Sequence, residues 1–344
     1  MQNKPPRRFS FLFLLVVLMF LQSCKTYEFF TIDILEPATV DIPKDIKKIL
    51  VIHNFDFTNR DTLGTFYQIY DHWVYDTLYI DTLLGRFAID QLTDKLNNLG
   101  RFEAISIDSA GMNFPVNHEL FRLEDVTYLK NLCIENQTDA LIMLNSAKKR
   151  VEYSAFYNDF VGYYGEFSVY LNTNWLMINP FTSRLLDNKT IFDTVYFQST
   201  EFLFEDGFET EERRHEYMMS AFEEAAKHYC ERISPHYATT DRVIFTKGNR
   251  FLKKGYEQAA LGNWDKAASI WDKSLEGNDP KNLSKACFNL ALASEMNGLL
   301  PEALEWAEES HRLFPDTINQ VYISILKNRL EQQEKILKQM ESDN

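Results

Sequence analysis

The feature of the sequence that most restricts the fold is a repeat in its carboxy-terminal third. Gly262-Asn263-Trp264-Asp265-Lys266-Ala267 recurs as Gly298-Leu299-Leu300-Pro301-Glu302-Ala303, at an offset of 36 residues. A fixed period of this length indicates stacked helical units, each of which buries its apolar face only against a neighbour. Within a unit, a small residue lets two helices approach, a glycine forms the turn, and a proline ends the pair. The repeat therefore predicts an all-α region.

These units resemble tetratricopeptide repeats, whose period is about 34 residues. The residues that carry the resemblance are Gly255, Gly262, Ala267, Trp271, Ala291, Gly298, Ala303 and Pro315. The resemblance implies a groove that binds peptides or helices of partner proteins, lined by the first helix of each pair. On that groove we place Asn249, Leu252, Tyr256, Lys285, Phe288, Leu292 and Glu295, although half of these side chains are also compatible with the core. We expect a helix near residues 319–340 to cap the open end. Because two repeats bury little core alone, we also expect them to lean on a helix over residues 211–233 or on the domain before it.

The preceding part of the chain alternates between two hydrophobic periods. Compact apolar runs predict strands, and stripes at three- and four-residue spacing predict helices. The order is strand, helix, strand, helix, strand, over residues 48–52, 84–96, 102–107, 123–136 and 140–144. This alternation predicts an α/β layer in which helices pack on one sheet.

Three short motifs in this region carry a second resemblance. They are Asn54-Phe55 after the first strand, Gly100-Arg101-Phe102 after the helix, and Thr138-Asp139-Ala140-Leu141-Ile142 at the last strand. With them, residues 46–198 resemble the α/β domain shared by the TolB amino-terminal region, penicillin-binding-protein activator lipoproteins and the curli-secretion lipoprotein. That family binds envelope proteins and is not enzymatic, so the resemblance implies partner binding and structural roles for Gly100, Phe102 and Ile142.

Residues 147–199 alternate with period two, which predicts antiparallel strands. Thr173 and Asp193 interrupt the apolar face that a membrane-inserted hairpin needs, so we expect a soluble sheet. Between two of the strands we expect an aromatic loop that contacts a partner, formed by Phe156, Tyr157, Phe160, Tyr163 and Tyr164. The alternative is that these rings cap the sheet edge.

No motif in the sequence indicates catalysis, a cofactor or a metal. His215-Glu216 begins a zinc-protease pattern, but Met219 stands where the second histidine is needed. Cys133, Cys230 and Cys287 are an odd number without C-x-x-C spacing, so we expect buried thiols. Residues 54–81 mix acidic and aromatic side chains, for which a solvated loop is favoured over a sugar or cation site.

The amino terminus has the layout of a signal peptide. Lys4, Arg7 and Arg8 precede an apolar run over residues 9–21, which is shorter than the ~20 residues that a membrane-spanning helix needs. Leu21-Gln22-Ser23-Cys24 then resembles the lipobox of bacterial lipoproteins, in which the cysteine is acylated. The absence of Asp after Cys24 implies sorting to the outer membrane of a Gram-negative cell, facing either the periplasm or the cell surface.

Cleavage before Cys24 would remove three basic residues and no acidic ones, so the net charge would fall from −14 to −17. Nucleic acid and anionic lipid repel such a chain, which excludes nucleic-acid binding and leaves membrane attachment to the acyl chains.

We therefore predict an α+β protein, an α/β sandwich domain with a mixed sheet followed by an all-α tetratricopeptide-like domain. The predicted parts are a lipoprotein signal peptide (1–23), a tether (24–45), the α/β domain (46–205), a connecting helix (206–240) and the repeats with their cap (241–344). The whole arrangement resembles an uncharacterised family of tetratricopeptide-repeat lipoproteins. The predicted function is a non-catalytic adaptor that binds envelope proteins; the alternatives are a secretion-pore or assembly subunit and a carbohydrate-binding surface lipoprotein.

Overall fold

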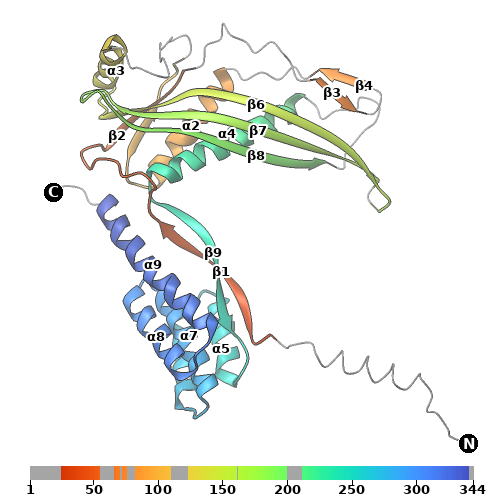
Figure 1. The fold of residues 1–344 in the computed structure, drawn as a ribbon, viewed down its shortest axis with the longest axis vertical. Helices are drawn as coiled ribbons and strands as arrows, with labels where there is room; N and C mark the ends of the chain where they lie inside the picture. Colours follow the sequence, from red (N-terminus) through yellow and green to blue (C-terminus); the bar gives the residue numbers. More distant parts are fainter. Residues whose placement is uncertain are drawn as a thin grey trace, which may run out of the picture. The chain divides into compact units, whose positions relative to one another are not determined.

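The computed structural model describes residues 25–54, 66–69, 72–75, 82–109, 123–160, 162–199 and 211–340. The chain divides into two compact units. The sheet unit comprises Leu35–His236 and Lys335–Asn344, and the helical unit comprises Met1–Ile34 and Tyr237–Glu334. The five-stranded mixed sheet of the first and the helices of the second confirm the predicted α+β class (Figure 1).

The sheet unit is built on five strands in the order β5-β2-β6-β7-β8. Their bounds are β2 Lys48–His53, β5 Glu103–Ser106, β6 Ala140–Asn158, β7 Gly162–Asn179 and β8 Arg184–Ser199. Strand β2 runs parallel to β5 and to β6, whereas β6, β7 and β8 are antiparallel. Residues 49–52 are fully buried, as expected for a central strand that is covered on both faces. The central strand predicted from the apolar run is thereby confirmed.

Helices cover the two faces of this sheet unequally. Helix α2 (Thr82–Asn98) and helix α4 (Glu211–Ile233) pack along one face, which we call the inner face (Figure 1). There Trp175 of β7 stacks on Tyr229 of α4 with ring centroids 5.1 Å apart. Helix α3 (Leu123–Glu135) packs on the opposite, outer face, against the end of the sheet where the strands are parallel.

Local sequence features place the ends of these elements. Gly100 follows α2 with a φ of 71°, which confirms the predicted helix stop. The Asn97 side chain then accepts a hydrogen bond from Ala104 N and donates one to Ala104 O, which ties the end of α2 to β5. Between β7 and β8, Asn179 Oδ1 accepts from the backbone amides of Phe181 and Thr182, in the turn predicted from Asn-Pro.

Part of the predicted loop over residues 54–81 is regular structure. Strands β3 (Phe66–Ile69) and β4 (His72–Tyr75) pair antiparallel. Most of the other residues of the segment lie outside the described part of the chain, and with them the sugar-site alternative.

The helical unit combines a two-stranded ribbon with a series of helices. Its elements are β1 Tyr27–Glu36, β9 His236–Phe245, α5 Arg250–Ala259, α6 Trp264–Asp272, a 3-10 turn Lys273–Glu276, α7 Pro280–Met296, α8 Leu300–Leu313 and α9 Thr317–Met340. Strands β1 and β9 pair with one another. Strand β1 lies in the stretch predicted to be a tether, and β9 begins in the stretch predicted to be a connecting helix. Among the described residues, no helix is long and apolar enough to cross a membrane.

Candidate functional site

The predicted lipidation residue Cys24 lies outside the described residues, as does the signal segment before it. Strand β1 begins at Tyr27, three residues further on. An acyl group on Cys24 would therefore be joined almost directly to the β1–β9 ribbon.

The repeat-signature residues lie where the helices of each pair meet. Gly255 of α5 faces the buried Trp271 of α6, and a Cβ at Gly255 would come within 2.1 Å of Trp271 Nε1. Gly262 and Gly298 have φ angles of 75° and 76°, which favour glycine over other residues. The remaining signature residues are three buried alanines and one exposed proline: Ala267, Ala291, Ala303 and Pro315.

The residues predicted to line a peptide groove lie mostly inside the helical unit. Five of the seven are buried: Leu252, Lys285, Phe288, Leu292 and Glu295. Tyr256 is half-buried and donates a hydrogen bond to Glu28 Oε2 of β1 at 3.2 Å. Asn249 is the N-cap of α5, and its side chain accepts from the first amides of that helix. In this arrangement the buried five do not form an open groove.

The chain's own β1–β9 ribbon packs where the peptide ligand was expected. Phe245 of β9 makes an edge contact with Phe288 of α7, with ring centroids 5.1 Å apart. The Asn289 amide accepts from Phe245 N at 2.9 Å and donates to Phe245 O at 2.8 Å, as a paired strand would. On β1, Phe30 contacts Trp264 with centroids 5.3 Å apart. The sequence prediction missed this because β1 was assigned to a tether.

A buried ion pair links the ribbon to the helices. Arg242 of β9 donates to both carboxylate oxygens of Glu295 on α7, at 2.9 Å and 3.1 Å. Tyr322 of α9 donates to the same carboxylate at 2.9 Å. The side chains of Arg242 and Glu295 are 5% and 1% exposed, so each charge depends on the other for compensation. Glu295 is thus a structural residue of the helical unit.

The predicted aromatic loop is largely the end of a β-hairpin. Strand β6 continues to Asn158 and β7 begins at Gly162, so Phe156 pairs with Tyr164 and Tyr157 with Tyr163. The expectation of a loop over residues 156–164 was therefore wrong, because the alternation of strand residues extends almost to the turn. Tyr157 and Phe160 are 61% and 98% exposed. The side chains of Phe156, Tyr163 and Tyr164 lie outside the described part of the chain.

Beyond α3, the outer face of β6, β7 and β8 carries exposed aromatic and basic side chains. Phe192 and Tyr196 of β8 are 76% and 70% exposed. On β6, the Arg150 guanidinium lies 4.5 Å from the centroid of the Tyr170 ring on β7. Glu152 holds this pair, because it accepts from the Tyr170 hydroxyl at 3.0 Å and lies 3.2 Å from Arg150 Nη2. That hydrogen bond also raises the pKa of Tyr170.

This part of the sheet is hollowed between β6 and β8. The hollow has a volume of about 230 Å³ and is lined by Lys148, Lys149, Arg150, Tyr170, Leu171, Asn172, Phe192, Asp193 and Thr194. The sequence prediction missed these residues, but a signal was present. Tyr170, Phe192 and Tyr196 occupy the positions that alternate with the predicted apolar face, where small polar residues are usual. We take this surface, the outer face of β6–β8, as the candidate site.

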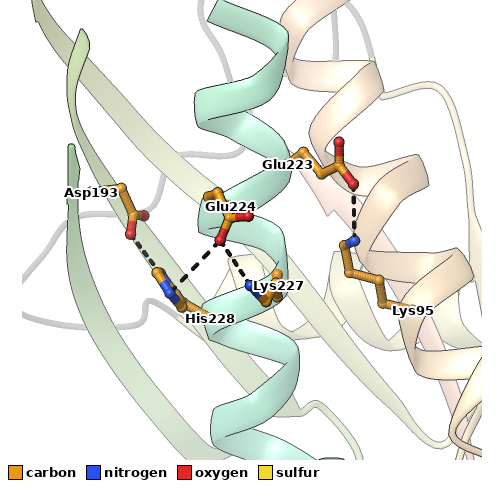
Figure 2. Close-up of polar contacts among 6 residues, drawn as sticks. All are labelled: Lys95, Asp193, Glu223, Glu224, Lys227 and His228. Atoms are coloured by element: carbon orange, nitrogen blue, oxygen red, sulfur yellow. Dashed lines mark hydrogen bonds and ion pairs between the residues drawn. The ribbon is translucent and has the colours of Figure 1, made fainter. Parts of the chain in front are cut away.

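On the inner face, charged side chains of β8 are paired with α4. Asp193 Oδ1 lies 2.5 Å from His228 Nδ1, and Glu224 Oε2 is 3.1 Å from Lys227 Nζ and 3.9 Å from His228 Nε2 (Figure 2). Burial raises the pKa of Asp193, whose side chain is only 4% exposed. The carboxylate predicted to interrupt the apolar face is therefore paired through Oδ1 with a histidine of α4, while its Oδ2 has no hydrogen-bond partner among the described residues.

Two further polar pairs extend this inner-face contact. Arg232 of α4 donates to both oxygens of Asp187, at 2.8 Å and 3.0 Å. Lys95 of α2 lies 3.2 Å from Glu223 of α4 and ties the two helices together (Figure 2). Inward-pointing charges on an outer strand also discourage pairing with other chains.

Within the described residues, no group of three or more His, Cys, Asp and Glu side chains is placed to hold a metal. Cys133, Cys230 and Cys287 are free and buried, which confirms that expectation. Burial raises the pKa of Cys230 and of Cys287 to about 12, so neither thiol is a reactive thiolate.

Comparison with known protein families shows the family to which the chain belongs. The family described as "Domain of unknown function (DUF8603)" matches residues 46–245, more than half of the chain, and the chain belongs to that family. A second family, described as "Domain of unknown function (DUF6340)", matches residues 253–331. No curated protein matches the chain.

Two solved structures are distantly similar. A PelC dodecamer from Paraburkholderia phytofirmans is 9% identical, with a TM-score of 0.26 and coverage of 60% of this chain and 98% of that one. A neuraminyllactose-binding hemagglutinin homolog from Helicobacter pylori is 9% identical, with a TM-score of 0.30 and coverage of 57% and 89%. TM-scores of this size carry no inference about function.

Proposed function

We propose that this protein is a lipid-anchored adaptor of the bacterial cell envelope, which binds other envelope proteins without catalysing a reaction. The observation that carries the proposal is the outer face of β6–β8. Phe192 and Tyr196 stay largely exposed on a sheet whose inner face packs against α2 and α4. Exposed aromatic side chains grouped on a rigid surface are typical of protein–protein contact sites.

The anchor is the second part of the proposal. Acylation of Cys24 would hold the protein at a bilayer, most simply at the outer membrane, facing the periplasm or the cell surface. Each buried CH₂ of an acyl chain contributes about 0.8 kcal/mol, so several chains hold firmly where one does not. The acidic body, with a formal charge of −14 for the whole chain, would add no attraction to anionic lipid.

We propose further that the helical unit is tetratricopeptide-like, with an internal role. The contact of Gly255 with Trp271 and the left-handed Gly262 and Gly298 support that assignment. Because the β1–β9 ribbon packs on α5 and α7, this unit would hold the segment that follows the anchor. The sheet unit is then left to bind the partner.

One observation favours a second candidate, a subunit of a secretion pore. Strands β6 and β7 have 19 and 18 residues, whereas about 9–11 are enough to cross a bilayer as a barrel strand. The packing of the inner face against α2 and α4 supports a role inside the protein instead. Detergent-resistant rings of this chain, with membrane-protected hairpin residues, would favour the pore.

Two experiments test the adaptor proposal. With Cys24→Ser, we expect loss of the fatty-acid label and release from the membrane fraction; a variant that stays membrane-bound would contradict the anchor. With Phe192→Ser and Tyr196→Ser together, we expect partner proteins to stop co-purifying while the protein level is unchanged. The matched control is Leu299→Ser with Val321→Ser, which removes exposed apolar side chains from the helical unit.

A further inference from the structure

The hollow on the outer face differs in charge from the rest of the chain. Lys148-Lys149-Arg150 is the only run of three consecutive basic residues in a sequence with 36 basic and 50 acidic residues. Lys148 and Arg150 line the hollow from the outer face, whereas Lys149 between them is in register with Leu171 and Asp193 and belongs to the inner face. The acidic residue of its lining, Asp193, is buried against His228 on the inner face. Glu152, further along β6, is engaged by Arg150 and Tyr170.

The register of the strands shows how these groups are arranged. Lys148 pairs with Asn172, which pairs with Phe192, and Arg150 pairs with Tyr170, which pairs with Thr194. Neighbouring strands lie about 4.8 Å apart, so the basic side chains of β6 and the exposed ring of β8 are separated by about 10 Å. A segment of a few residues can therefore contact both walls at once.

Screening decides whether the local charge or the net charge acts on a ligand. At physiological ionic strength the Debye length is about 8 Å. Lys148 and Arg150 lie within that distance of a ligand in the hollow, whereas Asp193, the acidic residue of its lining, is paired with His228 on the inner face. An anionic group is therefore attracted to this surface even though the whole chain is acidic.

We propose that the hollow on the outer face of β6–β8 is the docking site for an extended acidic segment of a partner protein. Its carboxylates would lie against Lys148 and Arg150, and an aromatic or aliphatic side chain would pack on Phe192. This proposal rests on the adaptor function and names the chemistry of the partner. A segment lying across the strands suits the site better than one added to the edge of β8, because an added strand would be three strand spacings, about 14 Å, from β6.

The test uses the full chain in detergent and a short fluorescent peptide of Glu and Asp with one central Tyr, followed by fluorescence anisotropy. The control peptide has Gln and Asn in place of the acids. We expect the acidic peptide to bind and the neutral one to bind at least tenfold more weakly. Raising the salt from about 0.05 M to about 0.3 M should weaken the acidic peptide several-fold.

Charge reversal locates the binding. Lys148→Glu with Arg150→Glu should weaken the acidic peptide about tenfold or more, since each exposed ion pair lost changes affinity by up to about fivefold and reversal adds repulsion. The matched control is Lys253→Glu with Lys254→Glu, two exposed residues of α5, which should leave binding unchanged. Lys148→Ala keeps the test informative if the double variant misfolds, because Lys148 makes no ion pair with the described residues.

Equal weakening by the two double variants, or none by either, would overturn the proposal. Binding of an acidic polysaccharide with the same dependence on Lys148, but not of the peptide, would overturn the assignment of a protein segment. If partners require Phe192 and Tyr196 in cells while the acidic peptide does not bind, the adaptor function stands and the acidic chemistry is wrong.

Discussion

The ion pair between Arg242 and Glu295 gives the sharpest test of the helical unit. If Glu295 lined an open groove, replacing it would change ligand binding and leave stability nearly unchanged. The structure instead places its carboxylate 2.9 Å from Arg242 Nη2 and 2.9 Å from the Tyr322 hydroxyl, with a side chain that is 1% exposed. We predict that Glu295→Gln strongly destabilises this unit.

The magnitude follows from what the substitution leaves behind. Removing one partner of a buried ion pair costs about 3–5 kcal/mol, because the remaining charge is uncompensated in the interior. In Glu295→Gln the Tyr322 hydroxyl can still donate to the amide oxygen of the glutamine. Its contribution to the destabilisation is therefore smaller than the roughly 1–3 kcal/mol that an unsatisfied buried polar group costs. Domains are stable by about 5–15 kcal/mol, so the substitution should remove a large fraction of the stability.

The assay is urea unfolding followed by tryptophan fluorescence. Trp264, Trp271 and Trp306 are three of the five tryptophans and lie in the helical unit, so the signal mainly reports its unfolding. The control is Glu308→Gln, since Glu308 is 52% exposed and its pair with Lys327 at 3.2 Å should contribute less than about 1 kcal/mol.

A second variant tests the cause. Arg242→Met with Glu295→Leu removes both charges and should recover most of the lost stability, because apolar replacement of a buried pair is often neutral. Equal urea midpoints of unfolding for Glu295→Gln and Glu308→Gln would refute the reasoning. The prediction that Glu295 lines an open peptide groove would then stand again.

Three further predictions concern buried groups. Gly255→Ala should lower the free energy of unfolding by about 1–3 kcal/mol in the same urea assay, because the added methyl group collides with Trp271. This cost outweighs the gain of up to about 1 kcal/mol in helix propensity. An unchanged stability would contradict the close contact between Gly255 and Trp271. Cys230 and Cys287 should resist a thiol reagent at pH 8 until the protein unfolds, because burial raises the pKa of each thiol to about 12; rapid labelling of native protein would contradict their burial. Burial also raises the pKa of the Tyr322 hydroxyl well above 10, so the unfolded chain loses this proton at a lower pH than the folded chain. The free energy of unfolding should therefore fall as the pH rises above about 10, and it should fall less in Tyr322→Phe, as unfolding curves at several pH values would show. An equal fall in both proteins would contradict this.

Local patterns predicted the elements of the sheet unit well. The apolar run at residues 49–52 became a central strand, and Gly100 stopped α2 with a positive φ. These features depend on neighbours in sequence, such as a hydrophobic period or a turn residue. The spacing of Gly262 and Gly298 predicted turns between helices for the same reason, and both glycines have positive φ angles in the structure.

Pairings between distant residues were not predictable from one sequence. Strand β1 pairs with β9, about 200 residues away, and neither stretch has a local signal for the other. Glu295 and Lys285 were assigned to a groove because the tetratricopeptide resemblance implies that the first helix of each pair lines one, but Arg242 and the Lys247 carbonyl pair with them inside the unit.

The candidate site also combines features that local sequence patterns predict with contacts that only the tertiary structure shows. Alternation fixed which side chains share a face of β7 and β8, so Tyr170, Phe192 and Tyr196 could have been grouped from the sequence. The coverage of each face depends on α2, α3 and α4, which only the tertiary structure shows. Asp193 illustrates the difference, because its partner His228 lies on α4, 35 residues further on.

The most direct test of the account is site-specific photo-crosslinking in intact cells. A photoreactive residue at position 192 on the outer face of β6–β8 is compared with one at position 321, an exposed site on α9. The account predicts a defined envelope protein crosslinked from position 192, lost on Lys148→Glu with Arg150→Glu, and none from position 321. The same products from both positions, or products only from position 321, would contradict it.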